Sequence, residues 1–204
     1  MLIEILGENP DSRKIKQVAD VLKNGGIVVI PTDTIYAFAA SLNNKKGLER
    51  LAKFKGVKLN KAQFSLICDG LSDISTFTKP IERNVFRALK NSLPGPFTFI
   101  LNANNHVAKL FGTNKKEVGI RVPDHQITKA IVQQLGHPLV STSVHDDDHI
   151  IEYTTNPQAI FEKYEDNVEM VIDAGYGKNQ PSTIVDCTTG ELSILRQGIG
   201  ELNP

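Results

Sequence analysis

A buried strand between a helix end and a polar turn is predicted for Gly25-Gly26-Ile27-Val28-Val29-Ile30-Pro31-Thr32-Asp33-Thr34-Ile35-Tyr36. Ile27 to Ile30 is a continuous β-branched run, the pattern of a strand that is covered on both faces. Gly25-Gly26 is suited to end the preceding helix, and Pro31 ends the strand. A strand buried in this way indicates an α/β protein.

Outward from this stretch, helices and strands interleave along the chain. Asp11 or Ser12 can cap a helix that runs to about Asn24. Apolar patterns predict further helices at 45–54, 81–93 (with Phe86 inward), 126–135 (capped by Asp124) and 157–164. Strands are expected at 2–6, 64–68, 97–101, 118–122, 139–144, 170–173, 182–186 and 192–195, and the polar stretch 102–117 has no expected element. Since strict βα alternation is absent, we expect a twisted, mixed β-sheet with surrounding helices.

The composition is that of one soluble domain, residues 1–204. The chain has 23 basic and 23 acidic side chains, so nucleic acid could be bound only by a local basic patch. Cys68 and Cys187 are far apart and are expected to be buried, reduced thiols. No signal-peptide pattern and no apolar run near about 20 residues is present, so we expect a cytoplasmic protein without a membrane span.

Polar side chains follow the buried strand directly. Thr32, Asp33, Thr34 and Tyr36 place two hydroxyls, a carboxylate and a phenol at its end. Ends of strands in α/β sheets are common ligand sites. A turn in which these side chains hydrogen-bond to the backbone is an equally valid interpretation.

Several other clusters could contact an anion. Lys53, Lys55, Lys58 and Lys61 surround Gly56 and could meet phosphates as point charges, or form a solvated face. The hydroxyls of Ser141-Thr142-Ser143 and Ser182-Thr183 lie at strand ends. Arg121 and Arg196 lie near the ends of apolar strands, where a guanidinium binds carboxylate or phosphate, or forms a structural ion pair.

Some chemistry is not supported by the sequence. His145 and His149 flank three aspartates and could bind a metal on a helix, but the segment lacks helical periodicity and fits a solvated loop better. There is no GxGxxG after a strand, no GxxxxGK[ST], no GxSxG and no HExxH, which argues against Rossmann, P-loop, α/β-hydrolase and zincin sites.

Seven motifs together resemble the YrdC/YciO family in order and spacing across nearly the whole chain. They are the opening stretch 25–36, Lys55-Gly56 with Lys61, Pro94-Gly95-Pro96-Phe97-Thr98, Val118-Gly119-Ile120-Arg121-Val122-Pro123, Pro138-Leu139-Val140-Ser141-Thr142-Ser143, Pro181-Ser182-Thr183-Ile184-Val185-Asp186 and Leu195-Arg196-Gln197-Gly198.

The resemblance implies a YrdC-like mixed sheet around a large concave cavity that binds ATP or AMP, with tRNA or double-stranded RNA as a further partner. Synthase members condense L-threonine, bicarbonate and ATP into L-threonylcarbamoyladenylate for tRNA modification. Mg²⁺ would accompany ATP, and no metal held by the protein itself is implied.

The resemblance also implies roles for individual residues. Catalytic roles fall to Lys55, Lys61 and Arg121. Binding of the amino-acid substrate falls to Thr32, Thr34, Tyr36, Ser141 and Ser143. Binding of the nucleotide falls to Lys55, Lys58, Lys61, Thr98, Thr142, Ser182 and Arg196.

Three departures make the chain look like the YciO branch. Synthase members carry a KxR pair and a later Lys-Pro, whereas this chain has Lys55-Gly56-Val57 and Lys61-Ala62. In synthase members Ala-Asn follows the STS motif, whereas this chain has Val144-His145. In those members Gly follows the tyrosine, whereas this chain has Ala37. Two functions therefore remain open: a threonylcarbamoyladenylate synthase, and a nucleotide- or RNA-binding module without that activity.

Overall fold

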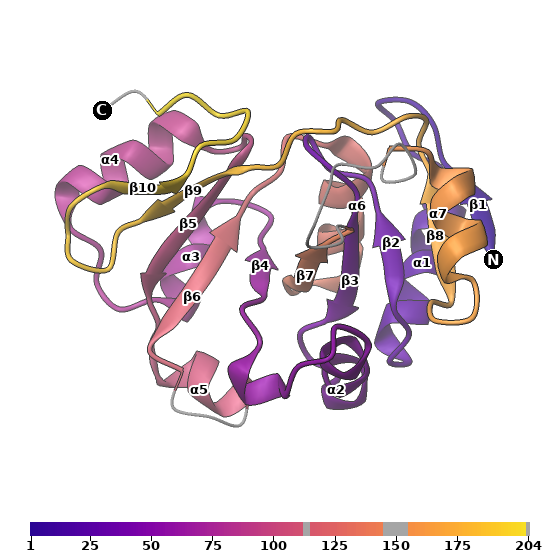
Figure 1. Cartoon of the computed structure of the whole chain (residues 1–204), viewed down its shortest axis with the longest axis horizontal. Helices are drawn as coiled ribbons and strands as arrows, with labels where there is room; N and C mark the ends of the chain where they lie inside the picture. The colour runs from indigo at the N-terminus through magenta and orange to yellow at the C-terminus, as the bar shows by residue number, and fades with distance from the viewer. Residues whose placement is uncertain (112–114, 145–154, 203–204) are drawn as a thin grey trace.

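The computed structural model describes residues 1–111, 115–144 and 155–202, and these residues contain one ten-stranded sheet. Its order is β1-β8-β2-β3-β7-β4-β6-β5-β9-β10 (Figure 1). The strands are β1 (Leu2–Glu4), β2 (Val28–Ile30), β3 (Ala37–Ser41), β4 (Ser65–Ile67), β5 (Phe97–Asn102), β6 (Glu117–Arg121), β7 (Leu139–Ser143), β8 (Met170–Asp173), β9 (Thr183–Asp186) and β10 (Ser193–Arg196).

The sheet is mixed, as expected from the irregular alternation of elements. Neighbouring strands are parallel in β1–β8, β8–β2, β4–β6 and β5–β9. They are antiparallel in β2–β3, β3–β7, β7–β4, β6–β5 and β9–β10. Figure 1 shows β5, β6, β9 and β10 on one side of the molecule and β1, β2, β3 and β8 on the other, with β4 and β7 between them.

Helices cover the sheet on both sides. The described residues form α1 (Ser12–Lys23), α2 (Lys45–Phe54), the 3₁₀ turn η1 (Leu59–Lys61), α3 (Leu71–Phe77), α4 (Arg83–Ser92), α5 (Asn105–Phe111), α6 (Gln126–Leu135) and α7 (Pro157–Tyr164). Helices α1 and α6 pack on one side of β2 and β3, where Val28 and Ile30 face them. Helices α2 and α7 pack on the other side, against Val29 and Phe38. The burial of β2 on both faces is therefore confirmed.

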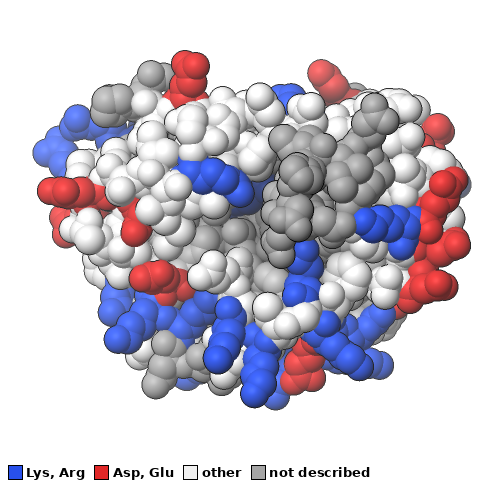
Figure 2. Space-filling view, viewed as in Figure 1, with Lys and Arg blue, Asp and Glu red and all other residues white. Residues whose placement is uncertain are grey.

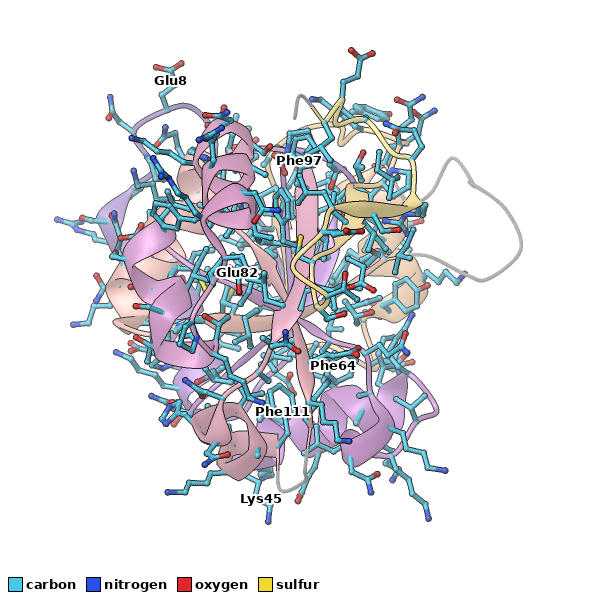
Figure 3. The ribbon with its side chains drawn as sticks, turned by 90° about the vertical axis from the view of Figure 1, so that its left-hand side faces the viewer. Glu8, Lys45, Phe64, Glu82, Phe97 and Phe111 are labelled. Carbon is cyan, nitrogen blue, oxygen red and sulfur yellow. The ribbon has the colours of Figure 1, made fainter. Side chains whose placement is uncertain are left out.

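The core also buries both cysteines, as predicted. Cys68 and Cys187 are free thiols in the interior. Burial, assisted by the nearby Asp186 carboxylate, raises the pKa of Cys187 to about 12. Figure 3 shows the labelled Phe64, Phe97 and Phe111 inside the molecule, with Glu8 and Lys45 at opposite ends. No helix among the described residues is long and apolar enough to cross a bilayer.

Several expectations about local structure were wrong or incomplete. The sequence patterns did not predict β3, α3 or α5. Phe86 on α4 is 48% exposed, because Ala88 takes the inward position beside Val85 and Leu89. Asp124 does not cap α6; His125 is the N-cap residue and makes no side-chain cap bond. The end of α6 at Gly136, in the left-handed conformation, agrees with the prediction.

Candidate functional site

A directed chain of hydrogen bonds organises the loop between β2 and β3. Arg121 Nη2, at the end of β6, donates to Thr34 Oγ1 at 3.0 Å. The Thr32 hydroxyl donates to the carbonyl of Ile35 at 2.7 Å. Since a hydroxyl has one proton, the 3.1 Å contact between the two threonine hydroxyls must run from Thr34 to Thr32. Figure 1 shows the loop that follows β2 and the segment that follows β6 meeting at the top of the view.

This direction decides what each threonine can offer a ligand. Thr32 Oγ1 also accepts from the backbone N–H of Thr34 at 3.0 Å, so its proton and both lone pairs are used. Thr32 therefore shapes the loop and has no hydrogen bond left for a ligand. Thr34 has already used its proton and one lone pair, so one acceptor position remains on this fully buried hydroxyl.

Arg121 is the buried cation of this region. It is 5% exposed, and its Nη2 lies 3.4 Å from Asp33 Oδ1. Burial, the largest influence, lowers the pKa of Arg121, Asp33 opposes this shift, and the nearby Arg196 adds to it. Arg121 Nε is buried without a hydrogen-bond acceptor in the described structure. Buried polar groups are normally paired, so this donor lacks an acceptor that a ligand or an ordered water would supply.

A second group of polar side chains lies around Arg196 on β10. Arg196 Nη2 donates to the carbonyl of Ser182 at 2.7 Å and lies 3.5 Å from Ser182 Oγ. Ser182 Oγ is in turn 2.8 Å from Thr98 Oγ1 on β5. Strand β5 pairs with β6 with Phe99 opposite Ile120, so Thr98 lies beside Arg121 in the sheet. Side chains from β5, β6, β10, the residue before β9 and the β2–β3 loop are thus brought together.

Small polar residues extend this group across the sheet. Ser141 on β7 pairs with Ser65 on β4, and Ser65 pairs with Gly119 on β6. A Cβ on Gly119 would lie 2.8 Å from Ser65 Oγ and 3.5 Å from Thr98 Cγ2, so these atoms share one face. Ser143 lies on the same face as Ser141, two residues along β7. Figure 2 shows a recess in the middle of the molecular face, with Lys and Arg side chains at its borders.

Other predicted site residues lie apart from this group. Thr142 pairs with Phe38, so its side chain points to the face opposite Ser141 and Ser143. Lys55 Nζ lies 5.8 Å from the centre of the Phe38 ring, on that same side. The Tyr36 hydroxyl donates to the Gly175 carbonyl at 2.7 Å and accepts from the Ala174 N–H at 3.2 Å. Burial raises the pKa of Tyr36 to about 12, which keeps this phenol protonated at neutral pH.

The lysines of the basic loop lie on the surface. Lys58 and Lys61 are exposed at the two ends of η1. Lys115, which the sequence patterns did not single out, donates to the carbonyl of Ala62, next to Lys61. Its ammonium lies 4.8 Å from the centre of the Phe111 ring, and burial lowers the pKa of Lys115.

Two more residues were not predicted as part of the site. Asp33 was noticed only as a polar residue of the turn, but its carboxylate joins Arg121 to the backbone N–H of Asp124. Ser65 follows Phe64 in an apolar run, and only strand pairing places it beside Ser141. The segment from His145 to His149 lies outside the described residues. Within them, no group of three His, Cys, Asp or Glu side chains is arranged to hold a metal ion.

Comparison with known proteins agrees with this architecture. The family model described as "Telomere recombination", which covers Sua5, YciO and YrdC proteins, matches residues 20–198. The chain belongs to the Sua5/YciO/YrdC family. A relative from Haemophilus influenzae, described as uncharacterized, is 34% identical over 97% of this chain and 95% of its own length. The uncharacterized YciO protein of Escherichia coli is 33% identical over the same shares of the two chains.

Solved structures of family members share the fold. The crystal structure of E. coli YciO matches with a TM-score of 0.88, at 32% identity over 98% of this chain and 97% of that one. The structure of P. abyssi Sua5 complexed with L-threonine matches with a TM-score of 0.85, at 22% identity over 97% of this chain and 57% of that one. The expected YrdC-like mixed sheet with surrounding helices is confirmed by these likenesses.

Proposed function

We propose that this protein binds L-threonine and ATP in the recess and forms L-threonylcarbamoyladenylate. The observation that carries the proposal is the buried Arg121 Nε without an acceptor, beside a Thr34 hydroxyl that can only accept. A carboxylate fits the first group, and an ammonium or hydroxyl fits the second. An amino acid with a hydroxyl side chain has all of these groups. A Sua5 protein of the same fold has been solved with L-threonine, which agrees with this assignment.

The nucleotide is assigned to the neighbouring side chains. Arg196, Ser182 and Thr98 offer a guanidinium and two hydroxyls within one connected group. Such groups suit phosphate oxygens or the ribose of AMP. Lys55, Lys58 and Lys61 would approach the triphosphate only if the bound ligand extends toward the α2–η1 segment. Mg²⁺ would enter with ATP and offset the charge of its phosphates.

The proposed chemistry needs no nucleophilic side chain. The threonine amine reacts with bicarbonate to give a carbamate and water. A carbamate oxygen then attacks the α-phosphorus of ATP, and pyrophosphate leaves with the electrons of the broken P–O bond. Arg121, Arg196 and the hydroxyls would orient the reactants and stabilise the charge that develops on the phosphoryl oxygens.

Pyrophosphate release tests this proposal. Purified protein with ATP, threonine and bicarbonate should release pyrophosphate and form an adenylate, and omission of any one substrate should stop both. We expect slow turnover, since the loop has Val57 where synthases have arginine. Val57 is 41% exposed, so Val57→Arg fits sterically and should raise the rate about tenfold through one charge-assisted contact. Absence of product in both proteins, beside an active synthase, would refute the proposal.

A second candidate function is the binding of structured RNA, and the distribution of charge favours it. Residues 45–61 contain seven Lys or Arg and one acidic residue, although the whole chain is neutral. Lys45, Lys46, Lys53, Lys58 and Lys61 are exposed there. Figure 2 shows Lys and Arg side chains gathered along the lower edge, below the recess. Such a patch can contact a phosphate backbone.

Salt dependence tests the RNA candidate. If these lysines contact phosphates, Lys53→Gln/Lys58→Gln should weaken binding of a double-stranded RNA and lower the slope of log K against log salt by about two. The control is Lys16→Gln/Lys129→Gln, which removes the same charge from exposed positions on α1 and α6. Equal effects of the two variants would show that only net charge matters.

A further inference from the structure

A separate cavity lies among the loops at the strand ends. It has a volume of about 420 Å³. Its lining is Pro31, Thr32, Asp33, Tyr36, Pro94, Gly95, Pro96, Asp124, His125 and Ala174 to Lys178. None of Thr34, Thr98, Arg121, Ser182 and Arg196 lines it, so it is distinct from the site proposed for threonine and ATP. Its size is within the range of small-molecule sites.

Two side chains at the α6 end of this cavity, Asp124 and His125, have no described hydrogen-bonding or ion-pair partner for their polar atoms. The Asp124 carboxylate is exposed and forms no ion pair among the described residues. His125 Nδ1 is buried and has no hydrogen-bond partner there. Burial lowers the pKa of His125, against the opposing effect of Asp33 and Asp124, so the imidazole is neutral at pH 7. A neutral imidazole protonated on Nε2 presents Nδ1 as an acceptor.

The remaining hydroxyl and ammonium groups of the wall either use their protons within the protein or are exposed to solvent, as those of Tyr176 and Lys178 are. Thr32 has no free hydrogen-bonding capacity, and the Tyr36 proton is given to Gly175. Proline and glycine supply much of the wall and leave apolar surface. Lys178 is exposed and is held through its backbone N–H, which donates to the Thr34 carbonyl at 3.2 Å. Its ammonium is on a flexible stem and can turn toward solvent.

We propose that this cavity binds a small organic molecule with a primary ammonium group, which donates to the Asp124 carboxylate and His125 Nδ1. The ammonium would also lie near Asp33, the carboxylate that pairs with Arg121 on the other side of the same loop. The proline-lined walls would contact the apolar part of the molecule. This site requires neither ATP nor threonine, so it stands independently of the proposed synthase reaction.

Amide chemical shifts of the full chain provide the test, with n-butylammonium and its neutral analogue n-butanol as probes. Butylammonium should cause saturable shifts at His125, Gly175 and Gly177, and butanol should not. Asp124→Asn should weaken the apparent affinity about fivefold, through loss of one charge-assisted hydrogen bond at a solvent-exposed carboxylate.

The matched control is Asp20→Asn, which removes an exposed carboxylate from a groove beside α1 and should leave the affinity unchanged. Equal responses to butylammonium and butanol would overturn the proposal. Unchanged affinity in Asp124→Asn, or shifts centred on the groove beside α1, would also overturn it.

Discussion

Replacement of Arg121 with lysine is expected to lower the affinity for L-threonine about 10- to 100-fold while the protein stays folded. Lysine keeps the positive charge beside Asp33 but loses the planar guanidinium and its Nε donor. A hydrogen bond to a charged group contributes about 1.5–3 kcal/mol, which corresponds to this loss. Calorimetric titration of threonine measures it directly.

The choice of lysine matters because Asp33 is buried with Arg121. An apolar substitution such as Arg121→Met would leave a buried carboxylate without its cation and should destabilise the fold by about 3–5 kcal/mol. Arg50→Lys is the matched control. Arg50 also pairs with a carboxylate, Glu169, at 2.7 Å, but belongs to neither proposed subsite. Threonine binding in Arg121→Lys as tight as in the unmodified protein would exclude Arg121 as the carboxylate-binding group.

Arg196→Gln is expected to weaken ATP binding at least tenfold and to leave threonine binding within about twofold. The guanidinium lies at Ser182 and Thr98, and glutamine cannot supply its charge to a phosphate. Arg196 hydrogen-bonds to Ser182 and, in the described structure, not to Thr34, so its removal leaves the Arg121–Thr34 contact in place. Separate titrations with ATP and threonine give the two affinities.

Arg87→Gln is the control for this variant, because Arg87 is exposed on α4 and its loss changes net charge equally. An equal loss of affinity for ATP and for threonine in Arg196→Gln would contradict the assignment of the two ligands to separate subsites. Urea unfolding distinguishes that result from general destabilisation, since Arg196 also holds the Ser182 carbonyl.

Sequence patterns predicted best those elements whose apolar pattern is specific to one structural environment. The β-branched run that forms β2 has the pattern of a strand covered on both faces, and helices do cover both. Strand β3, with the sequence Ala-Phe-Ala-Ala-Ser, was missed because alanine has low strand propensity. Its five residues are all buried, and pairing with β2 and β7 makes it a strand. Tertiary context therefore overrode the local preference.

The same limit applies to the candidate site. Arg121 and Arg196 were singled out because a guanidinium near the end of an apolar strand either binds a carboxylate or phosphate or forms a structural ion pair, and Arg121 does pair with Asp33. Sequence spacing could not show that the Thr32 hydroxyl has all its hydrogen-bonding positions occupied whereas the Thr34 hydroxyl does not. That difference follows from the direction of three hydrogen bonds. The division of Ser141-Thr142-Ser143 between two faces follows from strand alternation and the pairing of β3 with β7.

Recognition of threonine depends on Arg121, whose buried Nε donor is unpaired, binding the carboxylate. Calorimetric comparison of L-threonine with L-threoninol, in which a hydroxymethyl group replaces the carboxylate, measures this dependence on the unmodified protein. We expect saturable binding of threonine and at least tenfold weaker binding of threoninol. Equal binding of the two compounds, or no binding of threonine at any concentration up to tens of millimolar, would contradict this expectation.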